Sequence, residues 1–165
     1  MGHVEQEADP TPHAGLALAV IEKPADYPAW LDAEQLANFL HEKMKPYHDQ
    51  VNDIKHALDY ALSSEEGKGG FIMVVSDKEQ LVASTVFLRT GMKGYIPEHI
   101  LLFVAVDPER RNQGIGAWLV KEALKYSKTA VKLHVEYDNP ARRLYERIGF
   151  TNKYAEMRYT PGGKQ

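Results

Sequence analysis

The chain has 165 residues, enough for one domain with a buried core, and its 44% hydrophobic and 26% charged residues are typical of globular proteins. A formal net charge of −3, with no run of lysine or arginine, argues against a nucleic-acid partner. The absence of cysteine excludes disulfides, thiolate metal ligands and a cysteine nucleophile, and no apolar run is long enough to span a membrane. We therefore expect a cytoplasmic protein without a nucleic-acid or membrane partner.

The first elements follow an acidic segment that contains two prolines. Residues 1–14 are expected to form a flexible tail, residues 15–160 a single domain, and residues 161–165 a C-terminal tail. The apolar run from Leu16 to Ile21 predicts the first strand of that domain.

Two helices and a hairpin are expected next. Apolar residues at helical spacing predict helices at about residues 29–44 and 49–64, which Pro46 separates. After a glycine-rich breaker, residues 71–76 and 81–89 have the composition of two strands joined by a short turn. We interpret this pair as a hairpin.

A strand, a glycine loop and a helix start then follow one another. The continuous apolar run from Ile100 to Val106 predicts a strand that is buried on both faces. It ends at Asp107-Pro108, and the chain enters a helix through Gly114 and Gly116. Amides at a helix start have no intrahelical partner and lie at the positive end of the helix dipole. Glycines there let an anion approach the backbone, so this segment is typical of a phosphate site.

A second motif lies downstream of a predicted strand at residues 131–136. The segment Asp138-Asn-Pro-Ala-Arg-Arg-Leu-Tyr-Glu-Arg-Ile-Gly-Phe150 predicts a short helix, because Asn139 is a good N-cap and Gly149 can end a helix. Tyr145 lies on the apolar face of this helix and is expected to point inward. From the helix alone, this tyrosine is either an ordinary buried side chain or a proton donor.

Together the two motifs resemble the GNAT superfamily of acyl-CoA N-acyltransferases. The acyl-CoA-binding motif of that family, Arg/Gln-x-x-Gly-x-Gly/Ala after Val-Asp-Pro, is filled by Val106-Asp107-Pro108 and by Arg111 to Gly116. The Asn-Pro-Ala-x-x-Leu-Tyr-x-x-x-Gly-Phe pattern is similar to the family's late helix. The resemblance implies a mixed α/β fold with a mostly antiparallel, twisted sheet of six to seven strands and about four helices. The implied order is β-α-α-β-β-β-α-β-α-β(-β). From the sequence, we expect a final strand at about residues 150–160.

The resemblance also implies an N-acetyltransferase that uses acetyl-CoA, and no metal, to acetylate a primary amine by direct attack on the thioester. In this family the late-helix tyrosine protonates the leaving thiolate, so Tyr145 is the expected general acid. The end of the strand would bind the pantetheine arm, and the loop amides would bind the pyrophosphate with the Arg111 side chain as a further contact. The expected cofactor-binding residues are Phe103, Val104, Ala105, Val106, Arg111, Asn112, Gln113, Gly114, Ile115, Gly116 and Asn139.

The catalytic base stays open at this level. Many relatives carry a glutamate on the strand before the glycine loop, but this strand contains no acid. Glu98 and His99 at its start and Glu136 on the following strand are candidates, although the ordinary role of each such residue is that of a surface or hydrogen-bonded side chain. Histidines elsewhere in the chain lack the spacing of a zinc site.

The acceptor pocket of the family is shaped by the first two helices, their connection and the last strands. Tyr47 and His48 lie in that connection and are the expected acceptor contacts. Because the chain after Gly149 is short for two strands and a loop, we expect an open wall there or a homodimer partner that supplies it.

Two other functions compete with an acetyltransferase. A catalytically silent acyl-CoA-binding sensor or interaction module is favoured by the missing strand acid. A nucleotide-binding domain is disfavoured, because the loop lacks both a Gly-Lys-Ser/Thr ending and a third glycine.

Overall fold

The computed structural model describes residues 14–163, which fall into two compact units that divide between Leu133 and His134. The tail predicted at residues 1–14 lies outside the described residues except for Ala14, and the C-terminal tail is described only to Gly163. A single domain over residues 15–160 stays a prediction.

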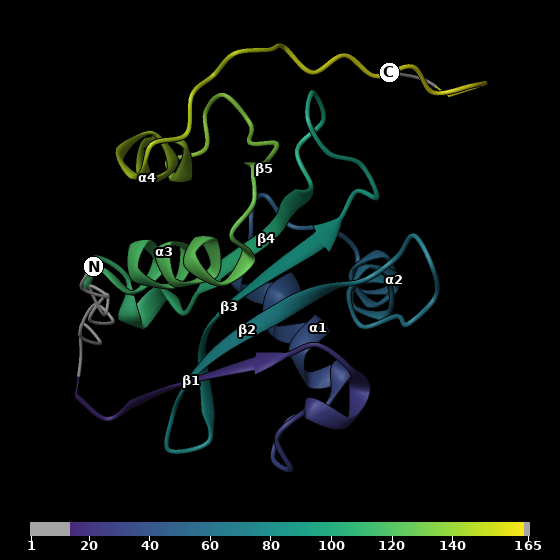
Figure 1. The fold of residues 1–165 in the computed structure, drawn as a ribbon. Coiled ribbons are helices and arrows are strands. Elements are labelled where there is room, and N and C mark those ends of the chain that lie inside the picture. The colour runs from purple at the N-terminus through teal and green to yellow at the C-terminus, as the bar shows by residue number, and fades with distance from the viewer. Residues whose placement is uncertain (1–13, 164–165) are drawn as a thin grey trace, which may run out of the picture. The chain divides into compact units, whose positions relative to one another are not determined.

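The first unit contains a five-stranded sheet and three α-helices, and the second contains one α-helix (Figure 1). None of these helices is long and apolar enough to cross a membrane, within the described part of the chain. The elements of the first unit are β1 (Leu16–Ile21), η1 (Pro24–Asp26), α1 (Ala33–Lys43), α2 (Val51–Ala61), β2 (Gly70–Asp77), β3 (Gln80–Arg89), β4 (His99–Val106), η2 (Pro108–Arg110), α3 (Ile115–Ser127) and β5 (Val131–Lys132). The second unit contributes α4 (Ala141–Ile148).

The sheet has the strand order β1-β2-β3-β4-β5. As predicted, its pairs are mostly antiparallel, and only β4 and β5 run parallel. The hairpin between β2 and β3 closes through Lys78 and Glu79, which both have positive φ angles of 48° and 62°. Positive φ at both central residues is the geometry of a two-residue turn whose twist matches the flanking strands.

The predicted number of six to seven strands is wrong for the described residues, which form five. β5 ends at Lys132, so Glu136 does not lie on a strand. Residues 150–160 form no strand either, and nearly all of their side chains are exposed, with Met157 92% accessible. Alternation of apolar and polar residues predicts a strand only where a neighbouring strand pairs with it and one face is buried.

The sheet of the first unit is covered on both faces. Ile72 and Val86 belong to a core cluster that includes Leu36 and Leu40 of α1 and residues of α2. Phe71 is adjacent to Ile72 and therefore points to the opposite face, where its ring contacts Tyr126 of α3 at a centroid distance of 4.8 Å. Thus α1 and α2 cover one face of the sheet and α3 covers the other (Figure 1).

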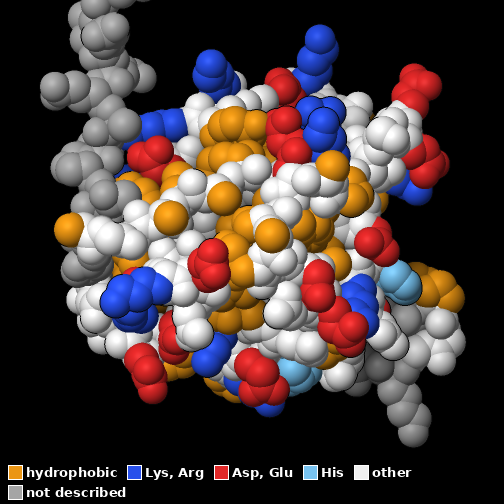
Figure 2. All heavy atoms as spheres, turned by 90° about the horizontal axis from the view of Figure 1, so that it is seen from below, with side chains coloured by type: hydrophobic (Ala, Val, Ile, Leu, Met, Phe, Trp, Pro, Cys, Tyr) orange, Lys and Arg blue, Asp and Glu red, His pale blue; other side chains and the backbone are white. Residues whose placement is uncertain are grey.

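Strand β1 forms one edge of this sheet and consists only of apolar residues, from Leu16 to Ile21. Only Ile21 is fully buried. Figure 2 views the molecule from the side on which β1 lies, and apolar side chains occupy the middle of this face between charged ones. The sheet thus ends in a strand without a charged side chain.

Candidate active site

The glycine loop leads into helix α3, which has no side-chain cap among the described residues. Gly114 is the N-cap of α3 and adopts a left-handed conformation with φ 79°. Trp118 makes the first intrahelical hydrogen bond, from its amide to the Gly114 carbonyl at 3.1 Å. No described side chain caps this helix start, and a Cβ placed on Gly114 would have no atom within 4 Å. The start of α3 therefore has no side-chain cap among the described residues and has free space around its N-cap glycine, which are features that an anion site requires.

The turn before the loop, residues 107–111, is held from several directions. The Asp107 amide donates to the Val82 carbonyl at 2.8 Å, and the Asp107 side chain accepts a hydrogen bond from the Glu109 amide at 3.1 Å. Arg110 forms an ion pair with Asp77 at the end of β2. These contacts fix the turn against the sheet.

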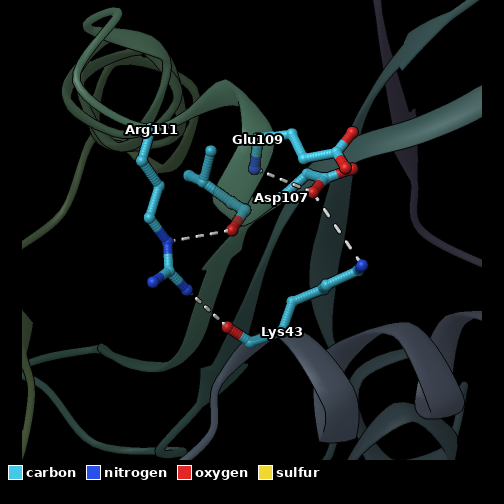
Figure 3. A network of polar contacts seen from close by, with 5 residues as sticks. Lys43, Asp107, Glu109 and Arg111 are labelled. Carbon is cyan, nitrogen blue, oxygen red and sulfur yellow. Dashed lines mark hydrogen bonds and ion pairs between the residues drawn. The ribbon is translucent and has the colours of Figure 1, made fainter.

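Helix α1 holds the same turn from the other side (Figure 3). The guanidinium of Arg111 donates to the Lys43 carbonyl at 2.8 Å and, more weakly, to the Val106 carbonyl at 3.4 Å. The Lys43 ammonium lies 3.8 Å from Asp107 Oδ1. The structure thus places the Arg111 side chain against the end of α1.

Strand β4 pairs with β5 only over its first two residues. The two strands pair only through His99 and Ile100, and a β-bulge follows at Leu102, because Leu101 pairs with Phe87 and Phe103 with Val86. Leu102 is 37% exposed, so this strand is not buried on both faces as predicted. Among the described strands, none pairs with β4 on its β5 side beyond Ile100.

The hydrogen-bond alternation of an antiparallel pair decides which backbone groups of β4 are available. The Asp107 amide points to β3, so the polar groups of Ala105 and Phe103 point there too, while those of Val104 and Val106 point away. The Phe103 carbonyl indeed accepts a hydrogen bond from Thr85 Oγ1 at 2.8 Å. Within the predicted run, Val104 and Val106 therefore present their backbone to the open edge, where Arg111 donates weakly to the Val106 carbonyl.

In the second unit, the predicted late helix is present as α4. Asn139 Oδ1 accepts a hydrogen bond from the Ala141 amide at 2.9 Å, and Gly149 ends the helix with φ 121°. Tyr145 is 9% exposed, and its ring lies edge-on to Phe150 at 5.8 Å. Burial raises the pKa of its phenol to about 12. Because of this raised pKa, the hydroxyl is protonated at neutral pH, and it is able to donate because no described residue hydrogen-bonds it.

The three base candidates lie in different surroundings. His99 is 8% exposed and lies on the α3 face of the sheet, with its Nδ1 2.7 Å from Thr129 Oγ1. Burial, followed by the charge of Arg89, lowers the pKa of His99. Glu98 precedes β4, and Glu136 is exposed in the second unit.

His99 also lies at the far end of β4 from the glycine loop. At about 3.3 Å per residue, its Cα is roughly 20 Å from that of Val106. Its ring packs 6.0 Å from Phe71 and 6.3 Å from Phe87. These aromatic neighbours place it in the core beside α3 and away from the α1–α2 connection.

The expected acceptor contacts lie between α1 and α2. The rings of His48 and His41 meet edge to face at 4.8 Å, and His48 Nδ1 is buried without a hydrogen-bond partner among the described residues. The Tyr47 amide donates to the Met44 carbonyl at 2.9 Å. Residues 14–163 contain no cluster of three or more histidine, cysteine or acidic residues that could hold a metal ion.

The acetyltransferase (GNAT) family model matches residues 28–150, well over half of the chain. The chain belongs to the GNAT acetyltransferase family. A mycothiol acetyltransferase of Pseudarthrobacter chlorophenolicus is 32% identical over 94% of the chain and 49% of its own length. The chain spans about half the length of the curated relatives it matches.

Solved structures agree with this family at the level of the fold. An aminoglycoside N-acetyltransferase in complex with CoA has a TM-score of 0.64 at 10% identity, over 88% of this chain and 93% of its own. A GNAT-family acetyltransferase from Streptococcus pneumoniae has a TM-score of 0.61 at 19% identity, over 88% and 97% of the two chains. The described residues of this GNAT member thus have a GNAT-like fold with a five-stranded sheet.

Two features of the site were not predicted from the sequence. Leu102 carries no glycine or proline signal for its bulge, which arises from pairing with β3. Lys43 lies far from the motif in the sequence and reaches Arg111 through its backbone carbonyl, which every residue possesses. Neither the bulge nor the contact between Lys43 and Arg111 has a sequence signature.

Proposed function

We propose that this GNAT protein transfers the acetyl group of acetyl-CoA to a primary amine. The observation that carries the proposal is the uncapped start of α3, directly after β4 and the family's glycine motif. A pyrophosphate would accept hydrogen bonds from the amides of residues 111–116, where the positive end of the helix dipole favours an anion. The pantetheine arm would bind the backbone of Val104 and Val106, and Asn139 would be a further cofactor contact.

The amine would attack the thioester carbonyl directly, without a covalent acyl-enzyme. The C–S bond breaks as the C–N bond forms, and the leaving thiolate takes a proton from Tyr145. The raised pKa of Tyr145 supports this role, because the phenol keeps its proton until a stronger base forms beside it. Backbone amides near the carbonyl oxygen would stabilise the negative charge of the tetrahedral intermediate.

The acceptor would bind beside the connection between α1 and α2. The α1–α2 connection with Tyr47 and His48 is the proposed acceptor wall, and the name of the curated relatives makes amines related to mycothiol the first candidates. Since residues 150–160 form no strand, the opposite wall is either open or completed by a second subunit. Light scattering of the purified protein distinguishes a monomer from a homodimer.

A silent acyl-CoA-binding module is the second candidate function. It is favoured by the absence of an acid from β4 and by the position of His99 beside α3. Such a module would bind acetyl-CoA but release no CoA with any amine.

Calorimetry and thiol release separate these functions. We expect acetyl-CoA to bind and to raise the unfolding temperature, whereas ATP and NAD do not. An amine library is then screened for release of CoA thiol, and the protein adds no thiol background because it has no cysteine. Binding of nucleotides but not of acetyl-CoA would contradict the proposal. Binding without turnover for every amine would favour the silent module.

A further inference from the structure

One residue of α1 contacts both ends of the turn that precedes the glycine loop. The Lys43 ammonium faces Asp107, where the turn begins, at 3.8 Å, and its carbonyl accepts the bond from Arg111, where the turn ends, at 2.8 Å (Figure 3). Lys43 is also the last residue of α1, so the α1–α2 connection begins at Met44, the next residue. The turn before the glycine loop and the start of this connection therefore both contact or adjoin Lys43.

The chemistry of these contacts suits a guanidinium. The Lys43 carbonyl lies in the last turn of α1, where carbonyls lack intrahelical donors and carry the negative end of the helix dipole. Arg111 reaches this carbonyl through Nη2 and the Val106 carbonyl through Nε, so its rigid fork joins the end of α1 to the end of β4. A lysine ammonium has no such fork.

We propose that Arg111 is a positioning residue that couples the acyl-CoA site to the α1–α2 connection, and that its side chain is not a ligand of the pyrophosphate. This inference rests on the proposed function. Ordering of residues 112–116 by acyl-CoA fixes Arg111, and Arg111 in turn fixes Lys43 and the start of the connection. Bound acyl-CoA would therefore raise the affinity for an acceptor that orders the connection. By linkage, the bound acceptor raises the affinity for acyl-CoA by the same factor.

Three variants distinguish a positioning fork from a phosphate ligand. Arg111→Lys keeps the charge and loses the fork. Arg111→Gln loses the charge, and the family motif accepts glutamine at this position. Arg110→Lys is the matched control, because Arg110 lies in the same turn but pairs with Asp77 and not with α1. Arg111 is exposed, so we expect all three variants to fold, which thermal unfolding verifies.

The experiment is amide hydrogen exchange with and without acetyl-CoA, together with the acetyl-CoA Kd of each variant. In the wild type and in Arg110→Lys, we expect acetyl-CoA to slow exchange both at residues 113–117 and at residues 44–50. In Arg111→Lys and Arg111→Gln, protection at 113–117 remains, while protection at 44–50 falls by about 3- to 10-fold, as expected for one exposed charged hydrogen bond.

Each contrary outcome has a distinct meaning. Protection of residues 44–50 that persists in both Arg111 variants overturns the coupling. Loss of acetyl-CoA affinity in Arg111→Gln but not in Arg111→Lys would identify the charge as a phosphate ligand and also overturn it. If the wild type does not bind acetyl-CoA at all, the proposed function fails and the coupling fails with it.

Discussion

Helices α1 and α3 begin in opposite ways. At α1, Asp32 Oδ1 accepts a hydrogen bond from the Gln35 amide, and Gln35 Oε1 accepts one from the Asp32 amide, both at 2.8 Å. At α3, the N-cap is Gly114, which has no side chain to offer. Of the four α-helices in the described residues, α3 alone has neither a side-chain acceptor at its start nor an acid in its first turn.

This difference separates stability from binding. The chain satisfies the amides of α1 with its own side chains, so that helix start contributes to folding. It offers no described side chain to the start of α3, where we propose that an anion binds, so that helix start would contribute to function at some expense of stability. Substitutions at the two positions should therefore change different measured quantities.

The largest effect is expected on kcat, for a substitution that removes the proposed general acid and leaves the acetyl-CoA site intact. Tyr145→Phe should lower kcat by about 10²- to 10⁴-fold, the usual contribution of a general acid, with little change in the Kd of acetyl-CoA. Because the pKa of Tyr145 is about 12, its ionisation should not lower the wild-type kcat below about pH 10. Steady-state kinetics across this pH range checks both statements. An unchanged kcat with the true acceptor would remove Tyr145 from the mechanism.

An acidic side chain at the start of α3 should raise the stability of the fold and weaken acetyl-CoA binding. Gly116→Glu places an acid in the first turn, which should stabilise the fold by about 1 kcal/mol through helix propensity and the dipole. The same carboxylate should weaken acetyl-CoA binding about 100-fold or more, as expected if two charge-assisted hydrogen bonds are lost. Thermal unfolding and calorimetry measure the two changes.

Gly116→Ala is the control for this substitution, because the family motif accepts alanine there. It should raise the free energy of unfolding by a similar helix-propensity contribution and still bind acetyl-CoA. If Gly116→Glu binds acetyl-CoA as tightly as Gly116→Ala, the start of α3 is not the anion site.

Opening the start of α1 is the reverse test. Asp32→Ala should lower the free energy of unfolding by about 1 kcal/mol through loss of the cap, and should leave the Kd of acetyl-CoA unchanged. Asp32→Asn keeps an acceptor oxygen and should retain most of the stability. Chemical denaturation gives these values, and a large loss of acetyl-CoA affinity in Asp32→Ala would show that the two helix starts are not independent.

The smallest effect is expected at His99, at the other end of β4. Its lowered pKa means that the folded state resists protonation, so the stability it contributes is present above about pH 6.5 and is lost as the pH falls toward the folded-state pKa. His99→Asn should therefore make the unfolding free energy decline less steeply below about pH 6.5. The slope should change by no more than the uptake of one proton on unfolding accounts for. Loss of the acidic limb from the pH profile of kcat/KM would instead identify His99 as the base.

The sequence predicted the parts of the fold that depend on local pattern. Leu16 to Ile21 forms β1 at the predicted bounds, and α3 starts at the predicted glycines, because apolar periodicity and glycine conformation act within a few residues. Residues 150–160 show the limit of that reasoning. A final strand is predicted there, but strand formation depends on a partner that local pattern does not contain.

The candidate site divides in the same way. The loop and Tyr145 could be located because each motif is contiguous in the sequence. The bulge at Leu102 and the availability of Val104 and Val106 depend on the register between β4 and β3, which only the structure gives. The position of His99 beside α3 likewise depends on which face of the sheet each helix covers.

One of the two contacts that Lys43 makes with the turn uses its main-chain carbonyl, and this determines how the contact responds to changes in sequence. Substitution at position 43 can delete the ion pair with Asp107, but any amino acid there keeps the carbonyl that Arg111 holds. A contact of this kind constrains the path of the chain and not the identity of the residue. Distant homologues could therefore preserve this contact even where the residue at position 43 differs among them.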